Sequence, residues 1–125
     1  MFGFGDHEES HNQVYGQEEH EGHLSHEVIA GAASFAAARS YEKKQREEGK
    51  PVSHAFAKEA LAGIAGAEVD KLVETKGLDY IDREKAKHQA KEYAQQGYDS
   101  HYGDKEEWHP DHEAPFDYNN ERYNY

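Results

Sequence analysis

The chain has 125 residues and a mass of 14.3 kDa, which leaves room for one small domain. Only 17 residues are Val, Ile, Leu or Phe, while 16 alanines and 9 tyrosines supply most of the remaining apolar content, so an enzyme with a large aliphatic core is excluded. The absence of cysteine also excludes a disulfide scaffold, a thiol nucleophile, an iron–sulfur cluster and a cysteine-type zinc finger.

The formal net charge of −12 is concentrated at the two ends of the chain. Residues 1–24 contribute −6 and contain no lysine or arginine, residues 104–125 contribute −5, and the balanced middle contributes −1. Acidic ends repel a phosphate backbone, so no nucleic-acid partner is expected. With no signal-peptide pattern and an uncharged apolar run of only 28–38, we expect a cytoplasmic protein without membrane contact.

The middle of the chain contains two similar helix openings, each with a hydrophobic residue, a serine and a histidine in succession. The first begins at Leu24-Ser25-His26 and predicts a helix that stops at Gly49, just before Pro51. The second begins at Val52-Ser53-His54 and predicts a helix that ends near Gly77. The short connection between them favours an antiparallel helical hairpin.

A third helix is predicted from Asp79, a possible N-cap, to about Gln96, with a possible extension toward Gly103. The flanking stretches lack apolar periodicity. We therefore expect an all-α fold with a helical domain over residues 24–103, a disordered His/Glu-rich tail over 1–23 and a disordered Tyr-rich tail over 104–125.

Apolar and small residues mark the faces through which the first two helices should pack or interact. Apolar pairs recur every four residues in the second helix, a spacing that favours crossed helices over a straight heptad seam. So few large aliphatic residues make a thin core, which favours self-association as a homo-oligomer or binding to a protein partner. The predicted packing and interaction residues are Val28, Gly31, Ala32, Phe35, Phe56, Ala60, Leu61, Gly63, Ile64, Ala67 and Leu72.

Histidines are the only candidates for chemistry. His7 to His11 match the H-E-x-x-H pattern of zinc proteases, but the segment has no apolar face to hold it rigidly, so no catalytic residue is assigned. A looser zinc site could use the tail histidines and their neighbouring carboxylates, and the alternative interpretation is that these polar residues only keep the tails solvated. The candidate metal ligands are His7, His11, His20, His23 and His26.

Several strings of the helical block are distinctive: 26–35, 65–71 and 98–102, Asp82-Arg83-Glu84 and, most specifically, 49–59. Through these strings, and over roughly residues 14–103, the chain resembles the fungal CipC-like antibiotic-response family. This resemblance implies a small cytosolic protein whose abundance responds to antibiotic or other stress, with no established enzymatic activity and no assigned catalytic residues. A weaker, compositional similarity is to plant stress- and ripening-induced proteins.

These observations predict a non-enzymatic stress-response protein that needs no cofactor and acts through helix-mediated self-association or partner binding. The alternative is a zinc-binding or desiccation-type protectant that acts through its His/Glu-rich tails.

Overall fold

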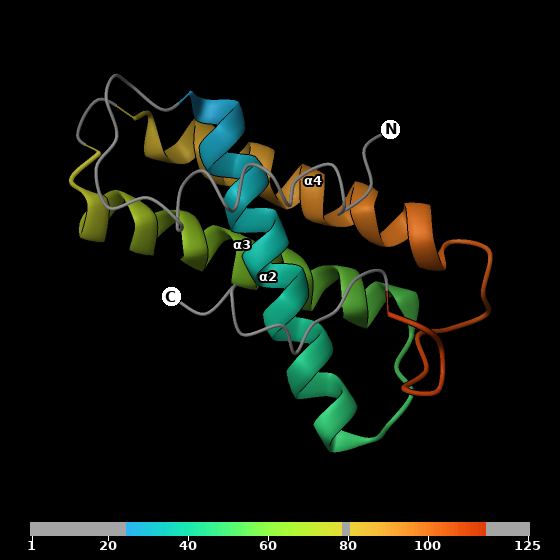
Figure 1. Ribbon diagram of the computed structural model, residues 1–125. Coiled ribbons are helices and arrows are strands. Elements are labelled where there is room, and N and C mark those ends of the chain that lie inside the picture. Colours follow the sequence, from blue (N-terminus) through green and yellow to red (C-terminus); the bar gives the residue numbers. More distant parts are fainter. Residues whose placement is uncertain (1–24, 79–80, 115–125) are drawn as a thin grey trace.

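A computed structural model describes residues 25–78 and 81–114, and three long helices make up most of this part of the chain. The helices are α2 (His26–Glu48), α3 (His54–Lys76) and α4 (Arg83–Tyr102). In Figure 1, α3 and α4 run side by side in opposite directions, and α2 crosses over both. The predicted all-α fold of three helices is therefore confirmed, and the helices that lie side by side in opposite directions are α3 and α4. The predicted tail over 1–23 and residues 115–125 of the predicted tail over 104–125 lie outside the described residues.

Local capping sets the ends of the first two helices. The side chains of Ser25 and Ser53 each accept a hydrogen bond from the backbone amide three residues later, at 3.1 Å. Gly49 and Gly77 close these helices with φ of 70° and 64°, left-handed values that a residue with a Cβ rarely adopts. These four positions confirm the predicted starts and ends.

The start of α4 differs from the prediction. Its N-cap is Asp82, whose side chain accepts from the amide of Lys85 at 3.2 Å, so the helix begins three residues later than expected. His26, at the first turn of α2, accepts the backbone N–H of Asp82 through Nε2 at 2.9 Å. This contact between the starts of α2 and α4 fixes where α4 begins. The capping pattern around Asp79 alone did not indicate it.

Residues at a strict four-residue spacing line the inner face of α4. Ala86, Ala90 and Ala94 are followed on the same line by Tyr98 and Tyr102, and all five are fully buried. On α3 the same spacing is followed by Ala57, Leu61, Ala65 and Val69. The core is thus thin where alanines allow close helix approach and thick at the end where the tyrosines lie, as ridge packing of crossed helices allows.

The segment after α4 folds back onto the thick end of the core. It contains no helix within residues 103–114, as expected, yet Trp108 is 0% exposed. Its backbone forms an antiparallel bridge with Val52, with two hydrogen bonds of 2.9 Å. The packed part of the chain therefore extends beyond the predicted boundary at residue 103. We call residues 103–114 the C-terminal clasp.

No helix in the described part of the chain is long and apolar enough to cross a lipid bilayer.

Candidate functional site

A buried carboxylate lies at the thick end of the core. Glu42 is 2% exposed and accepts hydrogen bonds from Arg46 Nε at 2.8 Å and from the Tyr102 hydroxyl at 2.8 Å. The indole Nε1–H of Trp108 lies 3.4 Å from the same carboxylate. Both carboxylate oxygens are thus engaged by donors from α2, α4 and the C-terminal clasp, which offsets the cost of burying the charge.

The Arg46 guanidinium connects this carboxylate to the clasp. Besides Glu42 it donates to the carbonyl of Pro110 at 2.6 Å and to the Tyr102 hydroxyl at 3.1 Å, and it lies 5.3 Å from the centre of the Trp108 ring. Burial alone would lower the pKa of Arg46, but the charge of Glu42 and the hydrogen bonds to Glu42 and Tyr102 together outweigh it, and the pKa rises. The Arg46 guanidinium therefore stays charged, and both side chains of the pair are engaged in contacts that hold the fold.

Three tyrosine hydroxyls surround this ion pair. Burial, followed by the negative charge of nearby Glu42, raises the pKa of Tyr98 and Tyr102 well above the ordinary value. The pKa of Tyr41 is also raised, chiefly by burial. Its hydroxyl is buried and has no hydrogen-bond partner among the described residues. The three rings are neutral at physiological pH and fill space rather than exchange protons.

His54, at the start of α3, joins α4 to the clasp. Its Nε2 lies 2.6 Å from the carbonyl oxygen of Lys105, so this nitrogen donates, and its Nδ1 lies 2.6 Å from the Tyr98 hydroxyl, from which it accepts in the neutral ring. Both nitrogens are occupied. Ser53 beside it caps the helix, so the neighbouring serine and histidine do not form a catalytic pair.

The side of α3 that lies away from its buried residues is largely exposed and carries no charge over more than two turns. Phe56 is 51% exposed and is the one large hydrophobic residue exposed in the described ranges. Ala60 is half-buried, and Gly63 and Ala67 are exposed on the same side of the helix. A Cβ placed on Gly63 would meet no atom within 4 Å. We call these four residues, with half-buried Ile64 beside them, the α3 face.

A hollow of about 350 Å³ runs along this face, between α3 and the last turns of α2. Its floor is formed by Tyr41 and by the residues of the α3 face other than Ala67, and its rim carries the exposed residues Lys44, Glu48 and Glu59. An apolar floor with a charged rim is the usual composition of a protein contact surface.

The structure divides the predicted packing residues into two groups. The first group has six members: Val28 is partly buried against the core, and the other five, buried in the contacts between helices, are Gly31, Ala32, Phe35, Leu61 and Leu72. The other five predicted residues are those of the α3 face. Phe56, Gly63 and Ala67 are exposed, because the spacing of residues along a helix does not tell which of its faces turns inward.

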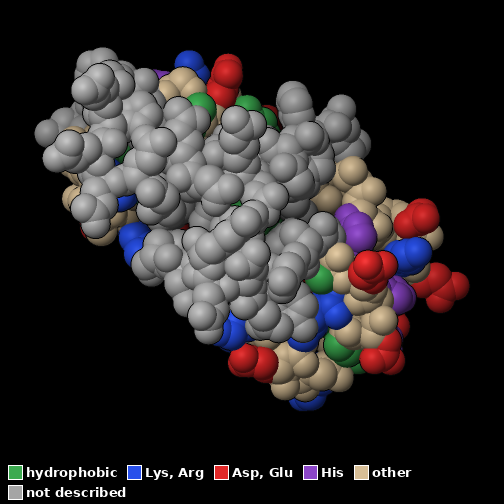
Figure 2. Space-filling model, viewed as in Figure 1, with side chains coloured by type: hydrophobic (Ala, Val, Ile, Leu, Met, Phe, Trp, Pro, Cys, Tyr) green, Lys and Arg blue, Asp and Glu red, His purple; other side chains and the backbone are tan. Residues whose placement is uncertain are grey.

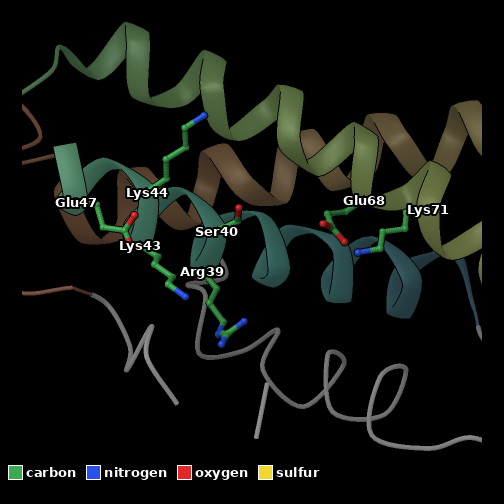
Figure 3. A pocket seen from close by; sticks show the side chains of 7 residues that line it. All are labelled: Arg39, Ser40, Lys43, Lys44, Glu47, Glu68 and Lys71. Carbon is green, nitrogen blue, oxygen red and sulfur yellow. The ribbon is translucent and has the colours of Figure 1, made fainter. Parts of the chain in front are cut away.

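A second hollow, of about 360 Å³, is lined mainly by charged side chains. Figure 3 shows that Arg39 and Lys43 point to one side of α2, that Lys44 points to the other, and that Glu68 and Lys71 on α3 point toward one another. The cations therefore do not converge on a single point. This arrangement is that of a solvated, mixed-charge surface.

The end of α4 and the clasp form another charged surface, where acidic, basic and histidine side chains lie interspersed (Figure 2). His109 accepts the amide of Asp111 through Nδ1 at 3.0 Å, so its neutral ring carries the proton on Nε2 and has no free lone pair for a metal. Across residues 25–78 and 81–114, no three His, Asp or Glu side chains are placed to hold a metal ion.

Of the five candidate metal ligands, the structure describes one. His26 uses the lone pair of Nε2 to accept the Asp82 amide, so in this arrangement that nitrogen does not bind a metal. The other four candidates, His7, His11, His20 and His23, lie outside the described residues. Sequence reasoning missed Glu42 and Trp108, because a glutamate in a charged run and a tryptophan in an acidic segment look solvated until the fold brings them together.

Three helices of 20 to 23 residues, locked by a buried ion pair and an aromatic clasp, define a small all-α protein whose most prominent surface is the α3 face. Residues 10–101 match the family model described as "Virulence factor CipC-like", and the chain belongs to this family. No curated protein and no solved structure shows significant similarity to it.

Proposed function

We propose that this CipC-like protein is a non-catalytic response protein that acts by binding a protein surface through the α3 face. The single observation that carries this proposal is the exposure of Phe56 beside a hollow with an apolar floor, whereas the other large apolar residues in the described ranges are buried or partly buried. Leaving such a ring in water costs free energy, and covering it with a partner recovers that energy.

The chemistry of the buried polar groups supports a non-catalytic role. Glu42 already accepts from neighbouring donors on both oxygens, and both nitrogens of His54 are engaged. These are the groups that a general acid or base would have to free, and freeing them would break the clasp. The polar interior of the protein therefore serves stability rather than proton transfer.

Membership of the CipC-like family, with the resemblance to its fungal antibiotic-response members, supports the proposal that the protein acts in the cytoplasm in the response to antibiotic or other stress. In such a role the abundance of the protein sets how much of its binding surface is present. A binding protein of this kind needs a rigid helix face, and α3 is held rigidly by the core on its other side.

The test is survival of antibiotic-treated cells of the source organism that carry Gly63→Leu in place of the natural residue. Gly63 lies in open space on a helix, so leucine leaves the fold intact but fills the hollow. The matched control is Ala55→Leu, which adds a similar side chain at an exposed position on another side of α3. Loss of the response with Gly63→Leu alone supports the proposal, and equal survival with both variants overturns it.

A further inference from the structure

The shape of the α3 face specifies what binds it. We propose that its occupant is a second copy of this chain, packed antiparallel about a two-fold axis that passes near Ala60. This inference rests on the proposed function, because it names the partner of the same face. It follows from three features of the face: a projecting ring, a hollow at a matching distance, and the order of charges on the rim.

The ring and the hollow lie on one helix at different heights. Phe56 projects at one end, whereas Gly63, seven residues further on, leaves open space. At 1.5 Å per residue, the two positions are about 10 Å apart along the helix axis. Four-, three- and four-residue steps join Phe56, Ala60, Gly63 and Ala67, which is the spacing of a seam between two helices.

An antiparallel two-fold is the arrangement that uses both features at once. It places Phe56 of each protomer at the level of the partner's Gly63, so that two rings fill two hollows. The midpoint between the two positions lies beside Ala60, where a small side chain lets the backbones approach. A parallel pairing would set ring against ring and leave both hollows unfilled. Antiparallel helices also align their dipoles favourably.

The charges on the rim fit the same symmetry. The positions of α3 that face the partner between Phe56 and Gly63 carry no charge, because Lys58 is paired with Asp99 and Glu59 lies on the rim, so no ion is buried at the centre of the contact. On the α2 side of the rim, Lys44 and Glu48 are exposed, lie one turn apart and belong to no ion pair with another described residue. Reversal of direction brings Lys44 of each protomer toward the partner's Glu48, so two attractive pairs form instead of two repulsive ones.

The chain contains no cysteine, which permits a direct test of the axis. In the proposed dimer the two copies of residue 60 face each other, so a single Ala60→Cys substitution should give a disulfide-linked dimer under mild oxidation. Ala55→Cys is the matched control, because it lies on the same helix, is exposed, and points away from the α3 face. Sedimentation of the unsubstituted full chain over a range of concentrations gives the dimer affinity.

We expect a concentration-dependent dimer, cross-linking of Ala60→Cys at least about tenfold faster than of Ala55→Cys, and about tenfold or greater weakening of the dimer by Gly63→Leu. Circular dichroism of Gly63→Leu shows whether its helices are intact. A monomer at every concentration, or equal cross-linking at both positions, overturns the dimer.

The proposed function is judged separately. If Gly63→Leu abolishes stress survival while the purified chain stays monomeric, the face binds a different protein and only the dimer is refuted. If Gly63→Leu leaves survival unchanged, the proposed function fails whether or not the chain dimerises.

Discussion

Trp108→Ala should remove most of the unfolding free energy that the clasp contributes. The ring is fully buried, packs edge-on against Tyr41 with ring centres 5.6 Å apart, and lies against the Arg46 guanidinium. Truncation of a buried tryptophan to alanine typically costs about 3–5 kcal/mol. A packed region of roughly 90 residues has a total stability of about 4–13 kcal/mol, so Trp108→Ala removes a large fraction of it.

Urea denaturation followed by circular dichroism measures this loss directly. A cost of about 3 kcal/mol should lower the melting temperature by about 12 °C or more in a domain of this size. Phe56→Ala is the control, since that ring is half exposed and its truncation should cost about 1 kcal/mol or less, measured under dilute conditions. Trp108→Phe should fall between the two. A cost below about 1 kcal/mol for Trp108→Ala would refute the conclusion that the clasp is integral to the core.

Three further predictions concern single groups. Tyr102→Phe should cost about 1–3 kcal/mol of unfolding free energy, because it removes a donor to buried Glu42, whereas Tyr41→Phe should be neutral or stabilising, because its hydroxyl has no partner in the described part of the molecule. Gly63→Ala should raise stability by up to about 1 kcal/mol, whereas Gly66→Ala should gain less, because its Cβ would meet a lysine side chain at 3.1 Å. Stability should fall as the pH rises above about 10, because the unfolded chain releases phenolic protons that the folded chain retains. Absorbance at 295 nm should show late ionisation of these rings. The rings concerned are those of Tyr41, Tyr98 and Tyr102.

Local chemistry in the sequence determined where two of the three helices begin and end. A serine hydroxyl reaches an amide only three residues away, and a glycine adopts a left-handed φ without help from the rest of the chain, so Ser25, Ser53, Gly49 and Gly77 could be recognised in isolation. The four-residue spacing of small and apolar residues likewise indicated crossed, closely packed helices.

The tertiary structure alone decided which groups became buried and which stripe stayed exposed. Glu42 and Trp108 lie 66 residues apart, and the carboxylate is tolerated in the interior only because its donors arrive from two other segments. The α3 face follows the same periodicity as the buried stripe, and it stays exposed because α2 and α4 cover the opposite side of the helix. Burial depends on distant partners, and no pattern within one turn of a helix specifies them.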